Sequence, residues 1–88
     1  MSQRHSTTMV LFNSSDRIQK IWMEPWGEEL FIPAGVGWRV TCESVSIPLE
    51  PIEVAIDDNS FAIFGTLHGT TKVMCNGDVI FECSFKEE

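Results

Sequence analysis

Turn-forming residues recur at short intervals along this chain, and their spacing constrains the fold more than any other feature of the sequence. Clusters of Asn, Asp, Ser, Pro and Gly stand at residues 13–16, 25–27, 33–35, 48–51, 57–59, 65–69 and 76–77. The segments between these clusters have the length of β-strands rather than of helices. The chain is therefore expected to fold as a series of short strands joined by tight turns.

The composition agrees with this expectation. Val, Ile, Thr, Phe and Trp together supply 30 of the 88 residues, whereas Ala and Leu supply 7. Stiff β-branched and aromatic side chains suit a pleated surface better than a helix. Strands are predicted near residues 8–12, 17–23, 29–32, 36–44, 52–57, 60–65, 70–75 and 78–85. We expect an all-β fold, a small antiparallel β-sandwich or barrel of jelly-roll or immunoglobulin-like type with about eight short strands.

The length fits one domain. A chain this short buries only ~60–65% of the surface that its unfolded form exposes, which supports a single modest core and no second one. Residues 1–8 are expected to be a disordered N-terminal segment, and residues 9–88 a single all-β domain. The apolar runs at 9–12 and 61–64 are far shorter than the ~20 residues of a membrane-spanning helix, and shorter than the apolar stretch of an export signal. We therefore expect a cytoplasmic protein that does not enter a membrane.

The strongest hairpin signal is the dipeptide at 76–77, Asn-Gly, because a type I′ turn requires positive φ at both central residues. It places Cys75 opposite Asp78. Continuing the ladder pairs Met74 with Val79, Lys72 with Phe81, and Thr70 with Cys83. In this register Phe81 lies on the buried face, while Cys75 and Cys83 project to opposite faces and are expected to remain unlinked.

A second hairpin is predicted around Asp58 and Asn59. The same geometry pairs Ile56 with Phe61, Val54 with Ile63, and Ile52 with Gly65. Alternation then places Ile56 on the buried face, and it points Glu53 and Glu82 outward.

The segment 14–24 fits two structures. A serine at 14 or 15 can cap a short helix with Ile18, Ile21 and Trp22 on one face, ended by Pro25. A strand over 17–23, pairing back onto 9–12, needs fewer assumptions in an otherwise β chain. The strand is the preferred interpretation.

The sequence gives little support for a metal site or for catalytic residues. The two histidines, His5 and His68, are too few for a histidine-metal barrel, and 57–60 lacks the spacing of a calcium loop. The three cysteines, Cys42, Cys75 and Cys83, are an odd number without C-x-x-C spacing, so we expect free structural thiols. No G-x-S-x-G motif is present. We expect no catalytic residues, no metal, no cofactor and no disulfide.

Acidic residues outnumber basic ones by thirteen to six, which gives a formal net charge of −7. Residues 24–60 hold eight of the acids and one of the basic residues. Nucleic-acid binding depends on Lys and Arg that displace counterions from phosphates, so nucleic acid is not an expected partner.

One short motif carries a resemblance. The stretch 24–29, E-P-W-G-E-E, is followed by a proline-glycine turn at 33–35 and by the alternating strand 38–43. In these features, and in the later Asn-Gly turn, the chain resembles a group of short uncharacterised bacterial proteins over roughly residues 9–82. The resemblance implies a stand-alone bacterial domain, and it implies no activity.

The candidate binding residues come from the same stretch: Glu24, Trp26, Glu28 and Glu29. Aromatic rings beside carboxylates suit a sugar, a cation or a protein hot spot. Trp22 and Trp38 are expected in the core. Trp26, between a proline and a glycine, is expected either to lie over the core as a lid or to contact a ligand, with the lid slightly favoured.

Three functions fit these observations. The first is a non-enzymatic protein-interaction or assembly module whose partner is another protein or a second copy, because small sandwiches leave sheet edges that partners can cover. The second is a small-ligand or carbohydrate-binding module that uses the loop at 24–29. The third is an acidic inhibitor or immunity-type protein that blocks a basic partner.

Overall fold

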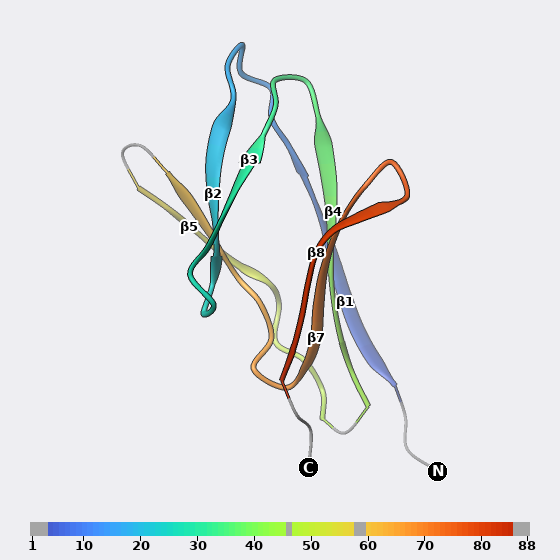
Figure 1. The fold of residues 1–88 in the computed structure, drawn as a ribbon. Helices are drawn as coiled ribbons and strands as arrows, with labels where there is room; N and C mark the ends of the chain where they lie inside the picture. Colours follow the sequence, from blue (N-terminus) through green and yellow to red (C-terminus); the bar gives the residue numbers. More distant parts are fainter. Residues whose placement is uncertain (1–3, 46, 58–59, 86–88) are drawn as a thin grey trace.

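The computed structural model describes residues 4–45, 47–57 and 60–85, and within them the chain forms eight β-strands (Figure 1). The strands are β1 (His5–Phe12), β2 (Gln19–Glu24), β3 (Glu28–Ile32), β4 (Gly37–Ser44), β5 (Glu53–Ile56), β6 (Phe61–Phe64), β7 (Gly69–Cys75) and β8 (Asp78–Phe85). The all-β prediction is confirmed. The described residues include no helix long and apolar enough to cross a bilayer.

The strands form two four-stranded sheets packed as an open sandwich, not a closed barrel. Sheet A has the order β1-β4-β7-β8, and sheet B has the order β3-β2-β6-β5 (Figure 1). Neighbouring strands are antiparallel except for β2 and β6, which are parallel. We call the side of each sheet that faces the other sheet its inner face, and the opposite side its outer face.

The first strand differs from the prediction in its start and in its partner. It begins at His5, so residues 5–8 belong to a strand rather than to a disordered segment. The segment 19–24 is a strand, as preferred, but it does not pair back onto β1. The linker between β1 and β2 instead crosses to the other sheet. Buried Asn13 holds it there, since its side-chain amide donates to the carbonyls of Arg17 and Ile32, both at 2.9 Å.

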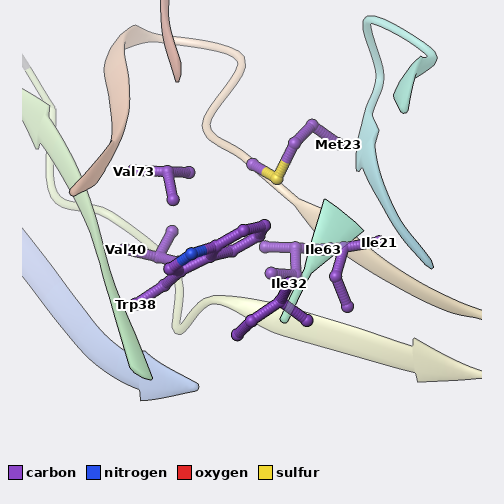
Figure 2. Close-up of a cluster of buried hydrophobic side chains, with 7 residues drawn as sticks. All are labelled: Ile21, Met23, Ile32, Trp38, Val40, Ile63 and Val73. Atoms are coloured by element: carbon purple, nitrogen blue, oxygen red, sulfur yellow. The ribbon is translucent and has the colours of Figure 1, made fainter. Parts of the chain in front are cut away.

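A small core fills the space between the sheets. Seven buried apolar side chains form it: Ile21, Met23, Ile32 and Ile63 from sheet B, and Trp38, Val40 and Val73 from sheet A. Figure 2 shows the indole of Trp38 extending between the side chains of the two sheets. Trp38 therefore lies in the core, as expected. Trp22 does not, because it stands between the inward-pointing Ile21 and Met23 and alternation sends it to the outer face of sheet B.

The hairpin of β7 and β8 contains a β-bulge that changes the predicted register. The pairs at the turn are as predicted, Cys75 with Asp78 and Met74 with Val79. The register then shifts between Val73 and Met74, and beyond the shift the pairs are Val73 with Phe81, Lys72 with Glu82, and Thr71 with Cys83. A bulge inserts one extra residue on one strand and bends it. Figure 1 shows the hairpin tip bending away from sheet B.

The bulge also changes the face to which the thiols project, so the prediction about their direction is wrong. Cys75 and Cys83 do not project to opposite faces, because the extra residue returns both to the inner side of sheet A. All three cysteines are free in the structure.

The hairpin of β5 and β6 has the predicted register, with Ile56 opposite Phe61 and Val54 opposite Ile63. Glu53 and Glu82 are exposed, as predicted. Ile56, however, is 76% exposed and not buried. It ends a four-residue strand at the edge of sheet B, where Figure 1 shows β5 diverging from sheet A.

This hairpin supplies a matched test of the core. Ile63 is 0% exposed and Ile56 is 76% exposed, on neighbouring strands. Ile63→Ala should lower the free energy of unfolding by about 2–5 kcal/mol, since it leaves a cavity in the core. Ile56→Ala should change it by less than about 0.5 kcal/mol. Urea unfolding measures both, and equal losses would contradict this packing.

Candidate functional site

The motif at 24–29 forms the turn between β2 and β3. Glu24 is the last residue of β2, and Glu28 and Glu29 begin β3. Gly27 has a φ of +70°, a conformation that glycine adopts without a steric penalty. The carbonyl of Glu24 also accepts a hydrogen bond from the amide of Gly65 at 2.8 Å, which ties the turn to the segment after β6.

Trp26 reaches from sheet B to sheet A and packs against the core as a lid. Its ring centroid is 5.5 Å from that of Phe81 and 5.5 Å from that of Phe85, both on β8 of sheet A. Gly65 makes room for the indole, because a Cβ at this position would lie about 2.5 Å from the ring. Trp26 thus connects the β2–β3 turn of sheet B to the edge strand of sheet A, and its packing serves the core.

The three glutamates do not converge with Trp26. Glu29 lies on the outer face of sheet B, where its carboxylate is 3.2 Å from the ammonium of Lys20. That ammonium also stands 5.5 Å from the centroid of the Trp22 ring. Glu24 shares this outer face, while Glu28 pairs with Met23 and is exposed at the start of its strand. The structure therefore brings Glu24 and Glu29 to the face that carries Trp22, and it separates both from Trp26.

The part of the chain that the structure describes gives little support for a metal site or for an enclosed ligand pocket. No three His, Cys, Asp or Glu side chains come together there in a way that can hold a metal ion. An open hollow of about 440 Å³ lies between the loop at 47–53 and the segment 64–68. Glu50, Glu53 and His68, which line it, are exposed, and most of the other lining residues are apolar.

Sheet edges are the remaining candidates, because an edge strand presents unpaired backbone N–H and C=O groups. Three of the four edges carry protection. Strand β3 begins with two glutamates, β5 has only four residues and begins with Glu53, and β8 contains the bulge. Short length, charge and bulges are features that discourage a sheet edge from pairing with another chain.

Strand β1 is the fourth edge, and it carries none of these features. Its eight residues, H-S-T-T-M-V-L-F, include no proline, aspartate or glutamate. All eight pair with β4 in one uninterrupted register, from His5 opposite Ser44 to Phe12 opposite Gly37. Within the described residues, β1 is thus the edge most ready to accept another strand.

The outer face beside this edge is apolar toward the C-terminal end of β1. Val10 is 66% exposed and Phe12 is 59% exposed. Val10 begins a row that crosses sheet A through Arg39 and Met74 to Val79. In the described residues the Arg39 guanidinium has no carboxylate within 4 Å. Exposed apolar side chains around an arginine are typical of protein-binding surfaces.

Searches for similar proteins find no match among family models, curated proteins or solved structures. The functional argument therefore rests on the residues and their arrangement.

The position of Trp26 gives a second testable prediction. Trp26→Ala should lower the free energy of unfolding by about 2–4 kcal/mol, because it removes a half-buried ring from Phe81 and Phe85. Glu28→Ala, in the same turn, is the control and should cost less than about 0.5 kcal/mol. Urea unfolding compares them, and a loss below about 1 kcal/mol for Trp26→Ala would show that the ring is not a lid.

Proposed function

We propose that this chain is a non-enzymatic protein-interaction and assembly module that binds a partner strand along β1. The observation that carries the proposal is the contrast between the four edges. Strand β1 is long, regular and free of acidic residues, whereas β3, β5 and β8 are protected by charge, shortness or a bulge.

The physical basis is strand addition. Alternate residues of an edge strand direct their N–H and C=O groups away from the sheet, and an extended segment of another chain can bond to them. Main-chain hydrogen bonds then supply affinity, and side chains next to the edge supply selectivity. On β1 these side chains are Val10 and Phe12, which expose apolar surface that a partner would cover.

The alternative of a small-ligand or carbohydrate site in the loop at 24–29 has less support. Such a site needs an open aromatic ring with polar groups directed toward the same ligand. Trp26 instead packs on Phe81 and Phe85, and Glu29 pairs with Lys20 on another face.

Site-specific photo-crosslinking tests the proposal without knowledge of the partner. A photoreactive residue replaces Ser6 on β1 or, as the control, Glu53 on β5; both positions are exposed and both lie on edge strands. In cells that produce the protein, the probe at Ser6 should form protein adducts several times more often than the probe at Glu53. Mass spectrometry identifies the protein and the segment attached. Equal or absent labelling from Ser6 would overturn the proposal.

A further inference from the structure

We infer that the strand bound along β1 is β1 of a second copy of this chain, running antiparallel to the first. The inference rests on the proposed function and names the partner of that site. The resulting dimer has two-fold symmetry, and its two four-stranded A sheets become one continuous sheet.

The distribution of charge selects this edge for contact between identical copies. Each copy has a formal net charge of −7, so two copies repel each other over most approaches. Antiparallel pairing through β3 would place two glutamates from each copy, Glu28 and Glu29, along a joint only five residues long, and pairing through β5 would place Glu53 of each copy along a joint of four. Strand β1 holds no carboxylate. It is the described edge along which two acidic copies can approach with the least local repulsion.

Among the described residues, the acid that stands beside β1 on the outer face is already paired. Glu43 stands opposite Ser6 on β4, and its carboxylate lies 3.4 Å from the Arg4 guanidinium. Arg4 directly precedes β1, so its positive charge balances the negative charge of Glu43 within the same copy. The apolar residues Val10 and Phe12 follow toward the other end of the strand.

Symmetry explains why such an assembly ends at two copies. When β1 of one copy pairs antiparallel with β1 of the other, both copies use the same surface. Both β1 edges are then paired, and neither can accept a further strand. The edges left at the ends of the joined sheet are the two β8 strands, each with a bulge. Because a bulged edge resists further pairing, the dimer does not grow into a fibre.

The net charge also predicts an unusual dependence on salt. Two copies of like charge repel, and added salt screens that repulsion, so dimerisation should strengthen as ionic strength rises. A complex between this acidic chain and a basic partner would weaken instead. The sign of the salt effect therefore separates self-association from inhibition of a basic protein.

Sedimentation equilibrium of the purified full chain tests the inference. The wild-type protein should show a monomer–dimer equilibrium in the micromolar range, tighter at high salt than at low salt. Thr8 is exposed on the outer face in the middle of β1. Thr8→Glu places a carboxylate in each copy at the interface, and it should raise the dimer dissociation constant at least about tenfold. The matched control Thr8→Gln should leave that constant within about threefold of wild type.

Both Thr8 variants lose the hydrogen bond between the hydroxyls of Thr8 and Thr41, so they differ in charge alone. Thermal melts verify that each is folded. If Thr8→Glu does not fold, Val10→Glu against Val10→Gln repeats the comparison at a position that is 66% exposed.

The possible failures are distinguishable. A wild-type chain that stays monomeric at all concentrations overturns the inference, and it leaves the proposed function standing if Ser6 crosslinks to a different protein in cells. A dimer that the glutamate substitutions on β1 do not weaken overturns the inference, since it places the interface elsewhere, and crosslinking from Ser6 then decides the proposed function separately.

Discussion

The small shared core is the constraint on which the rest of this structure depends. Within the described residues, two sheets of four strands enclose a core cluster of seven buried apolar side chains, and only the inner face of each sheet is covered. Among the described residues, no helix or further strand covers the outer faces and the edges. Partly buried side chains such as Trp26, Phe81 and Leu30 extend the core where the sandwich opens.

The same constraint leaves apolar side chains on the surface and gives the edges their importance. Val10, Phe12 and Ile56 are each more than half exposed, and they lie on edge strands. Three edges carry charge, shortness or a bulge, all of which oppose unintended pairing. The exception is β1, and an exception at one edge of an otherwise protected sandwich is the reason for placing the function there.

Much of the fold follows from local sequence signals. Turn residues mark the strand boundaries, and Asn76-Gly77 fixes the hairpin between β7 and β8 at its turn. Pairing between distant strands could not be predicted in this way. The partners of β1 and β2 depend on how the linker crosses between sheets, and that crossing depends on hydrogen bonds from Asn13 to Arg17 and Ile32. Nothing in the local pattern signals the bulge that moves Phe81 opposite Val73.

The candidate site was only partly predictable. The motif at 24–29 drew attention to Trp26, which packs as a lid. The position of Trp22 on the outer face was available from alternation, because Ile21 and Met23 flank it and point inward. Strand β1 could not be recognised as an edge from its sequence, since edges are defined by which strands lie beside each other in space.

Amide hydrogen exchange of the purified full chain, resolved by residue with NMR, tests most directly whether β1 accepts a strand. In an antiparallel ladder every second amide of β1 already bonds to β4, and the others face away from the sheet. The account predicts that the outward-facing amides of residues 5–12 exchange more slowly as protein concentration rises, while those of residues 53–56 on β5 do not change. Exchange along β1 that is independent of concentration would contradict the inference that β1 pairs with a second copy.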